Sequence, residues 1–262
     1  MTSKRNPEPP IPHDALTTLS LKEVLQALGL QHAAANLDAV LAKAITRNDS
    51  PSSMLDHLMR EQLRVHTEDR AKAALKRAAI FPLTTLDTYD FKHPKQIDKA
   101  LVLKAASLDF VRDKANLVLV GPSGVGKTHL SNAIGQLACL RGMRVRFVTA
   151  SDLVNDLVAS QARNTLAKRI HAWTTPDLLL IDELGYLGFD TRGADLLYQV
   201  INRRYQRAST VITTNLPFKD WGKLFHNQAA ASAIAERLVH KGIIIRITGA
   251  SFRTKNTITD DD

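Results

Sequence analysis

The segment that most constrains this chain is the run GPSGVGKT at residues 121–128. Its spacing, a glycine, four residues and then GKT, is that of a loop that wraps a phosphate group between a strand and a helix. Glycines let backbone N–H groups turn toward an anion without a clash from a Cβ atom. An apolar run at 117–120 precedes the loop, and a helical pattern follows it to about residue 141. We therefore expect the loop to bind the phosphates of a nucleotide.

The residues at the end of this loop have separate expected roles. Lys127 is expected to reach the β- and γ-phosphates and Thr128 to ligate Mg²⁺, while the helix that begins there points its positive end at the anion. The predicted nucleotide contacts are Gly121, Pro122, Ser123, Gly124, Val125, Gly126, Lys127, Thr128 and His129.

Two carboxylates follow a second apolar run. Residues 178–181 are all aliphatic, and Asp182 and Glu183 come directly after them. An aspartate at such a strand end holds the Mg²⁺ of a phosphate-loop site, so Asp182 is the second predicted metal ligand. Glu183 is predicted to polarise the water molecule that attacks the γ-phosphate, as a general base. The alternative is that Glu183 caps the loop ahead of Gly185.

A polar residue also follows the strand predicted at 209–214. Asn215 there would lie between the strands that carry Lys127 and Asp182, and is predicted to orient the attacking water. The alternative is a turn residue before Pro217, since asparagine commonly starts turns. The sequence contains no Asn-Lys-x-Asp motif for reading guanine, which favours ATP over GTP.

Three arginines are candidates for contacts outside the loop. Arg237 lies on a helix predicted just ahead of the last strand, where it could face the γ-phosphate of a neighbouring subunit. The alternative is a surface charge paired with Glu236 or with solvent. Arg203 and Arg204 are candidates for subunit contact or for DNA phosphates, with a solvated face as the alternative.

Local signals predict the other elements of the chain. Ser20 and Glu23 fit a capping box at the start of one helix, and Ser50 is expected to cap another that ends near Arg77. Further helices are expected to begin at Pro94 and after a cap at Ser151. The predicted strands are 117–120, 144–149, 178–181, 209–214 and 242–247. Because strands alternate with helices, we expect a parallel sheet covered on both faces.

Composition divides the chain into regions. The first thirteen residues contain four prolines and no periodicity, which is typical of disorder. The predicted division is a disordered tail at 1–13, a helical domain at 14–80, a connector at 81–114, a core at 115–255 and an acidic tail at 256–262.

The formal net charge of +9 favours a nucleic-acid partner over small acidic substrates. The alternative is a basic solvated surface that binds nothing. The predicted contacts to DNA phosphates are Arg60, Arg64, Lys72, Lys76, Arg77, Arg203, Arg204 and Arg207.

The single cysteine, Cys139, lies in an apolar run and excludes an intrachain disulfide framework. No apolar stretch has the length of a signal peptide or of a membrane span. We therefore expect a cytoplasmic protein that does not bind membranes.

Several motifs together resemble the DnaC/IstB-like branch of AAA+ ATPases, over nearly the whole chain from about residue 15 to 253. The matching segments are GPSGVGKTHL at 121–130, LLLIDELG at 178–185, INRRY at 201–205, TTNL at 213–216, ERL at 236–238 and GASFR at 249–253. The segment RAAIFPLTTLDTYDF at 77–91 is similar to the IstB side of this branch, the ATP-binding helper proteins of insertion-sequence transposition.

The resemblance implies an α/β fold, an AAA+ P-loop NTPase core with a five-stranded parallel sheet. It further implies a small all-α N-terminal domain before this core, which interacts with DNA and a transposase, and no C-terminal lid domain. It also implies the sensor-1 role for Asn215, the arginine-finger role for Arg237, and a homo-oligomer with ATP sites between subunits. Because the lid is absent, the arginine that a lid domain carries has no equivalent here, and Arg253 is a candidate for nucleotide or subunit contact.

Two functions fit best. The first is an ATP- and Mg²⁺-dependent ATPase that assembles on duplex DNA and activates a cognate transposase. The second is a DnaC-like replicative helicase loader, which shares the core but uses its N-terminal region to grip a helicase. The segment at 77–91 and the basic residues of the helix that ends near Arg77 favour the first. A DNA-binding scaffold with negligible turnover is a third reading, and a small-molecule kinase is disfavoured because no acceptor site is apparent.

Overall fold

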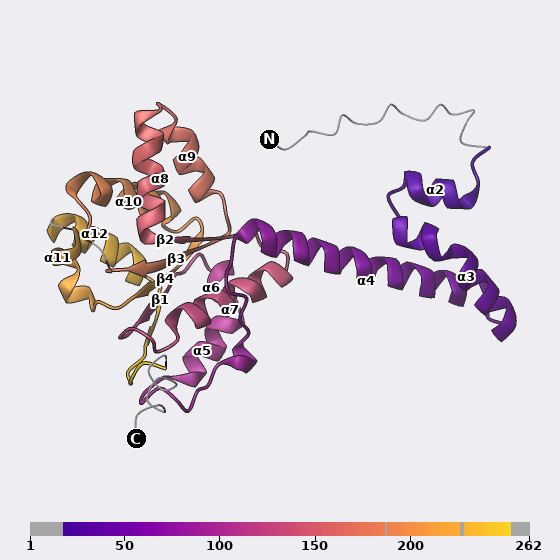
Figure 1. The fold of residues 1–262 in the computed structure, drawn as a ribbon, viewed down its shortest axis with the longest axis horizontal. Helices are drawn as coiled ribbons and strands as arrows, with labels where there is room; N and C mark the ends of the chain where they lie inside the picture. Colours follow the sequence, from indigo (N-terminus) through magenta and orange to yellow (C-terminus); the bar gives the residue numbers. More distant parts are fainter. Residues whose placement is uncertain (1–17, 187, 226–227, 253–262) are drawn as a thin grey trace, which may run out of the picture. The chain divides into compact units, whose positions relative to one another are not determined.

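We describe a computed structural model of the chain, in which residues 18–186, 188–225 and 228–252 are placed (Figure 1). The predicted tails at 1–13 and 256–262, and Arg253, lie outside these residues. The contacts divide the chain into two units, residues 1–70 and 71–262. The division falls within one long helix, and the predicted domain boundary at residue 80 stays a prediction.

The first unit is helical, with α2 (Leu21–Ala27), α3 (Gln31–Arg47) and most of α4 (Pro51–Ala78). The predicted capping box is confirmed, because the Ser20 hydroxyl accepts from the Glu23 N–H while the Glu23 carboxylate accepts from the Ser20 N–H. The Ser50 hydroxyl likewise accepts from the N–H of Ser53 at the start of α4. A small core holds the unit together, consisting of Leu25, Ala33, Ala34, Leu37 and Leu58.

The second unit contains the sheet. Its strands are β1 (Leu117–Val120), β2 (Val145–Thr149), β3 (Leu178–Leu184), β4 (Ser209–Thr214) and β5 (Ile243–Arg246). They are all parallel and lie in the order β2-β3-β4-β1-β5, so the predicted five-stranded parallel sheet is confirmed. Because β4 lies between β1 and β3, the residues that follow these three strands come to one edge of the sheet.

Helices cover both faces of the sheet (Figure 1). They are α5 (Lys99–Ala106), α6 (Asp109–Arg112), α7 (Lys127–Leu140), α8 (Ala150–Ala162), α9 (Leu166–Thr174), α10 (Thr191–Arg204), α11 (Trp221–Phe225) and α12 (Gln228–Val239), with short 3-10 turns η1 (Leu86–Thr88) and η2 (Phe218–Asp220). Among the described residues, no helix combines the length and the apolar character that a membrane crossing needs.

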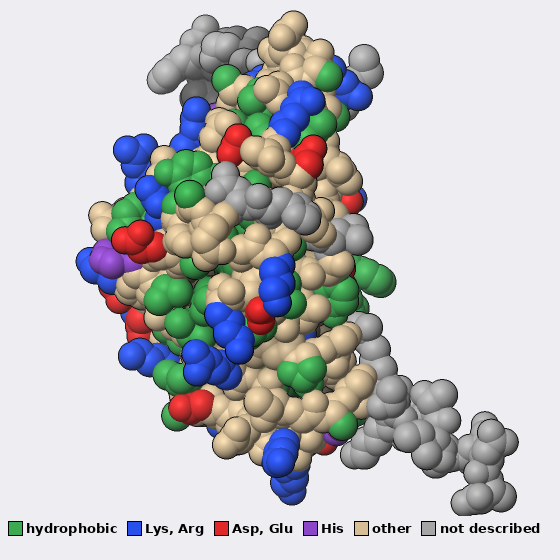
Figure 2. Space-filling model, turned by 90° about the vertical axis from the view of Figure 1, so that its left-hand side faces the viewer, with side chains coloured by type: hydrophobic (Ala, Val, Ile, Leu, Met, Phe, Trp, Pro, Cys, Tyr) green, Lys and Arg blue, Asp and Glu red, His purple; other side chains and the backbone are tan. Residues whose placement is uncertain are grey.

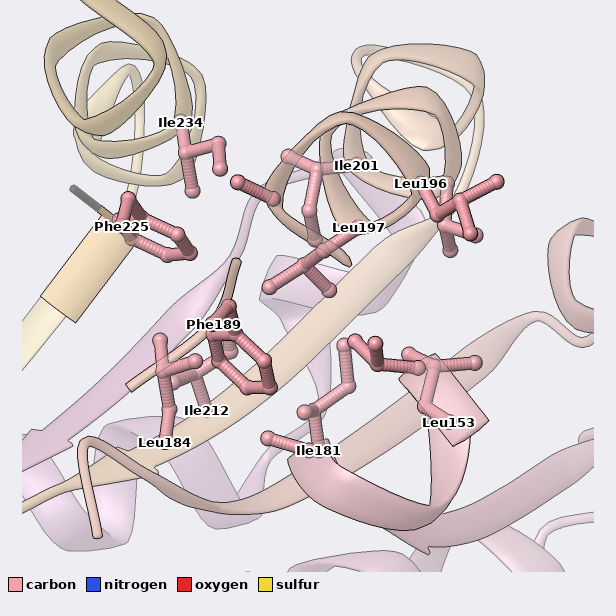
Figure 3. Close-up of a cluster of buried hydrophobic side chains, with 14 of the residues drawn as sticks. Leu153, Ile181, Leu184, Phe189, Leu196, Leu197, Ile201, Ile212, Phe225 and Ile234 are labelled. Atoms are coloured by element: carbon pink, nitrogen blue, oxygen red, sulfur yellow. The ribbon is translucent and has the colours of Figure 1, made fainter. Parts of the chain in front are cut away.

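The side chains of β3 alternate between two cores. Leu179 and Ile181 belong to the core shared with α8, α10, α11 and α12, part of which Figure 3 shows. Leu178 and Leu180 belong to the opposite core, shared with α5, α6, α7 and the last turns of α4. A strand that is buried on both faces has a continuous run of apolar residues, which is why the sequence alone predicted this strand.

Two predicted helix starts are wrong. Pro94 does not open a helix, because Gln96 pairs with Thr248 in an antiparallel bridge and α5 begins only after Asp98, whose carboxylate accepts from Leu101 N–H. Ser151 does not cap α8. The cap is Thr149, whose extended backbone lets its hydroxyl accept from the N–H of Asp152 at 3.1 Å.

Candidate nucleotide-binding site

The glycine loop joins β1 to α7, as predicted, and two other segments of the chain press against it. Gly126 has a φ of +90°. A Cβ atom there would come within 2.5 Å of the Tyr89 ring, whose hydroxyl donates to the Val125 carbonyl at 3.0 Å. On another side Gly124, with a φ of +79°, lies against Ser251, and its carbonyl accepts from the Phe252 N–H at 2.9 Å. The loop is therefore held from both the connector and residues 251–252.

The last two residues of the loop make different contacts, Lys127 with the loop itself and Thr128 with β3. Lys127 is almost fully buried, and its Nζ donates to the Gly121 and Pro122 carbonyls at 2.7 and 2.6 Å. Thr128 Oγ1 donates to both carboxylate oxygens of Asp182, at 2.9 and 3.1 Å. The structure thus brings the two predicted metal ligands into contact. Both present hard oxygen atoms, the donors that Mg²⁺ prefers.

Glu183 lies in a strained position at the same edge. Its φ is +60°, and the register of β3 against β4 shifts between Ile181 and Leu184. The Glu183 N–H donates to Thr213 Oγ1 at 2.9 Å. The exposed side chain of Glu183 lines a cavity beside the loop. Non-glycine residues in this region cost free energy and concentrate at functional sites. Within the described residues the Glu183 carboxylate accepts no hydrogen bond, which argues against a loop cap.

Asn215 follows β4 beside Gly185. Its Oδ1 is buried and has no hydrogen-bond partner in the described part of the chain. The turn after the strand is instead closed by Thr214, whose hydroxyl accepts from the Leu216 N–H at 3.1 Å. An orphaned buried acceptor calls for an explanation, and this geometry disfavours the turn-residue reading of Asn215.

A cavity of about 310 Å³ adjoins the loop. Besides Ser123 to His129 and Glu183, its walls include residues that the sequence did not assign to the site. These are Pro82, Thr84, Thr88, Tyr89, Asp90, His93, Pro94, Asn132, Tyr186, Thr213 and Phe252. Most lie in the connector, where the resemblance of residues 77–91 was a signal for the residues from Pro82 to Asp90 but not for His93 and Pro94.

His129 lines this cavity but directs its ring toward the connector. Its Nε2 lies 2.8 Å from the Thr85 carbonyl oxygen and 3.2 Å from Thr88 Oγ1, and its ring packs edge-on against Tyr89. Its contacts therefore attach the connector to α7.

Arg237 lies on α12 and is not among the described residues that line the cavity. Its Nε donates to Asn202 Oδ1 at 2.9 Å and its Nη1 to the Ala233 carbonyl at 2.9 Å. The guanidinium also lies over the rings of Tyr198 and Tyr205. It is not paired with Glu236 among the described residues.

The structure contradicts the prediction that Arg204 contacts DNA. The side chain is only 1% exposed, and its guanidinium donates to the carbonyls of Trp173, Thr174, Pro176 and Ser209 and to Thr210 Oγ1. Burial lowers the pKa of Arg204 to about 9, which still leaves it charged at neutral pH. Arg204 is a structural residue between α9 and β4. Arg203 and Arg207 remain exposed.

The basic residues of α4 fall into two groups. Arg60 pairs with Asp56, and Arg64 pairs with both Glu61 and Glu68. Lys72, Lys76 and Arg77 are exposed and form no ion pair with any described residue. The second group therefore offers more uncompensated positive charge.

Solved structures share this fold. AMPPCP-bound DnaA from Aquifex aeolicus matches with a TM-score of 0.55 at 22% identity, over 65% of this chain and 51% of that one. The DnaC helicase loader matches with a TM-score of 0.53 at 24% identity, over 63% of this chain and 97% of that one. Fold and loop together define a P-loop nucleotide-binding protein of the AAA+ class.

Relatives of higher sequence identity show which family within this class the chain belongs to. A protein of the insertion sequence IS5376 from Geobacillus stearothermophilus, named for ATP binding, is 35% identical over 90% of this chain and 94% of its own length. Its counterpart in IS232 from Bacillus thuringiensis subsp. berliner is 33% identical over 91% and 95%. The chain belongs to the family of IstB-like ATP binding proteins, which matches residues 23–259.

Proposed function

We propose that this protein is an ATPase that assembles on duplex DNA and assists the transposase of an insertion sequence. The observation that carries the proposal is the contact between Thr128 and Asp182 beside Lys127 and Glu183. These residues supply a phosphate-binding lysine, oxygen ligands for a metal ion and a carboxylate near the cavity. Together they are the parts that ATP hydrolysis on a phosphate loop requires.

Within this site each residue has a task. ATP binding replaces the two loop carbonyls on Lys127 Nζ with phosphate oxygens. Thr128 and Asp182 hold Mg²⁺, which neutralises phosphate charge when bound. The described residues contain no cluster of three or more His, Cys, Asp or Glu side chains suited to a metal ion. Mg²⁺ does not need one, because it is usually bound through one or two carboxylates, substrate phosphates and water.

The proposed chemistry is the attack of water on the γ-phosphorus. The Glu183 carboxylate takes the proton of the attacking water as the bond to the β,γ-bridging oxygen breaks, which gives ADP and phosphate. Asn215 orients that water from the neighbouring strand end. Arg237 is not among the described residues that line its own cavity, and it is proposed to act on the γ-phosphate of a second copy in a homo-oligomer.

The DNA partner is proposed from charge and from the relatives. The net charge is +9, and in Figure 2 Lys and Arg side chains are spread over the side of α11 and α12 with acidic side chains among them. We propose Lys72, Lys76 and Arg77 as the main phosphate contacts, with Arg203 and Arg207 on the core. Insertion-sequence relatives point to a transposase as the protein partner.

Fluorescence anisotropy of labelled duplexes tests this function. We expect binding without strong sequence preference that is tighter with ATP than with ADP, and that falls steeply with salt because counterions are released. Neutralising Lys72, Lys76 and Arg77 together should weaken binding and flatten the salt dependence. The matched double variant Arg60→Ala, Arg64→Ala should change it less, because those charges are already paired. Binding that responds to neither salt nor nucleotide would remove the DNA-assembly mechanism.

A replicative helicase loader is the second candidate, since the DnaC loader shares the fold. That likeness carries the fold alone, whereas the relatives of higher identity come from insertion sequences. A transposase gene directly upstream would decide for the first function. A turnover assay with DNA would separate both from a scaffold that binds ATP without hydrolysing it.

A further inference from the structure

We propose that Tyr198, Asn202 and Tyr205 form a cradle that positions Arg237 toward the ATP of a second copy of this chain. Their role is to hold the guanidinium, which makes them positioning residues rather than catalytic ones. The inference rests on the proposed function, because it takes Arg237 to act in trans.

The cradle makes three contacts with the guanidinium, one hydrogen bond and two cation–π contacts. Asn202 Oδ1 accepts from Nε at 2.9 Å, which sets the rotation of the planar group. The ring centroid of Tyr198 lies 5.0 Å from Cζ, and that of Tyr205 lies 5.8 Å from it. Cations within about 6 Å of an aromatic face are attracted to it. Arg237 is accordingly half-buried although it lies near the end of a surface helix.

The cradle comes from one stripe of α10. Tyr198 and Asn202 are four residues apart, so they project from the same side of the helix, and Tyr205 follows at its C-cap. Beneath them α10 and α12 share a core, in which Ile201 and Ile234 are both buried (Figure 3). A well-packed support of this kind fixes where both helices present their polar residues.

Tyr205 is itself fixed. Its hydroxyl lies 3.0 Å from His240 Nδ1 and accepts from Gln206 Nε2 at 3.3 Å. The rings of Tyr205 and His240 are 5.6 Å apart. The cradle therefore has a second tier of contacts that keeps its outer ring in place.

The third guanidinium nitrogen, Nη2, indicates the function of the cradle. Nε and Nη1 are engaged, while Nη2 donates no hydrogen bond to the described residues. Its two N–H groups stay available for phosphate oxygens. An arginine held in this way loses little conformational freedom when it meets an anion, and so contributes more to the rate than a mobile one. The neighbouring Arg203 is exposed and has no such contacts with the described residues, so this surface does not cradle every arginine.

Steady-state turnover and mixing of variants test the cradle. Asn202→Ala and Tyr205→Ala should bind ATP as the wild type does but turn over about tenfold more slowly, because the guanidinium is misplaced. Asn202→Asp, which keeps the acceptor oxygen, should retain turnover. Gln199→Ala is the matched control, since Gln199 lies on α10 and forms no hydrogen bond with the described residues.

Mixing separates a misplaced arginine from a damaged ATP site. Asn202→Ala mixed with Lys127→Ala should recover activity, because the second protein donates an intact Arg237 to the intact ATP site of the first. Asn202→Ala mixed with Arg237→Ala should not recover. The cradle is wrong if turnover of Asn202→Ala is unchanged, or if mixing fails to rescue it while Arg237→Ala is rescued by Lys127→Ala. If that last pair also fails, Arg237 does not act in trans, and the cradle falls with that part of the proposed function.

Discussion

Thr128 Oγ1 lies within hydrogen-bond distance of both carboxylate oxygens of Asp182, although the two residues are 54 positions apart in the chain. The contact joins the first turn of α7 to the end of β3. A fourth oxygen belongs to the same group, because the Thr213 hydroxyl from β4 also donates to Asp182 Oδ1. Three elements, α7, β3 and β4, thus converge on one buried carboxylate, and the fold itself brings the two predicted metal ligands together.

Asp182→Asn should therefore make ATP binding nearly independent of Mg²⁺. The amide keeps the size of the side chain but loses the negative charge that a hard cation requires. We expect affinity for a fluorescent ATP analogue to fall about tenfold with Mg²⁺ present and to change little in EDTA. Equal loss in both conditions would mean that Asp182 supports the loop rather than the metal ion.

Glu183→Gln should bind ATP normally and hydrolyse it about 10²- to 10⁴-fold more slowly, the range that a general base contributes. The substitution preserves the backbone bond to Thr213 and removes only the proton acceptor. Phosphate release under saturating ATP measures the effect, with the exposed Glu236→Gln as the control. Turnover close to wild type would make Glu183 a purely structural residue.

Gly126→Ala should weaken ATP binding at least about tenfold without removing any atom that contacts a phosphate. The new Cβ would meet the Tyr89 ring, and the φ of +90° is unfavourable for any L side chain. Gly142→Ala is the matched control, because Gly142 also has a positive φ, +79°, but open space around it. Both variants lose some stability, so ATP affinity is the measurement that distinguishes them.

Arg204→Met should destabilise the second unit by about 3 kcal/mol or more, because several buried carbonyls would lose their donor at about 1–3 kcal/mol each. The exposed Arg203→Met should change stability by less than about 0.5 kcal/mol. Urea unfolding followed by circular dichroism measures both. Similar midpoints for the two variants would overturn the structural role of Arg204.

Arg204 also shows why some side-chain roles could not be predicted from the sequence. The five strands and the place of the loop between a strand and a helix follow from patterns of a few adjacent residues, and the sequence predicted them correctly. Three of the four carbonyl partners of Arg204 lie about thirty positions earlier in the chain, so nothing in the adjacent Arg203 and Arg204 distinguished the exposed residue from the buried one. The packing of Tyr89 on Gly126 is likewise a long-range contact, and no local sequence pattern predicts it.

The prediction of where α8 starts was wrong for a different reason. Thr149 and Ser151 both carry a hydroxyl that can cap a helix, and the sequence alone did not distinguish them. The choice is made by the backbone, because β2 keeps Thr149 extended and delivers it directly to the first turn. Tertiary context therefore decided between two locally equivalent caps.

The most direct test of the central claim is calorimetric titration of ATP into the wild-type protein and into Lys127→Ala, in the presence of Mg²⁺. Lys127 is the buried cation of the loop, so we expect a saturable isotherm for the wild type and no measurable binding for the variant. Lys104→Ala, which removes an exposed lysine from α5, should bind like the wild type. Unchanged ATP affinity in Lys127→Ala would contradict the assignment of the nucleotide site and the ATPase mechanism built on it.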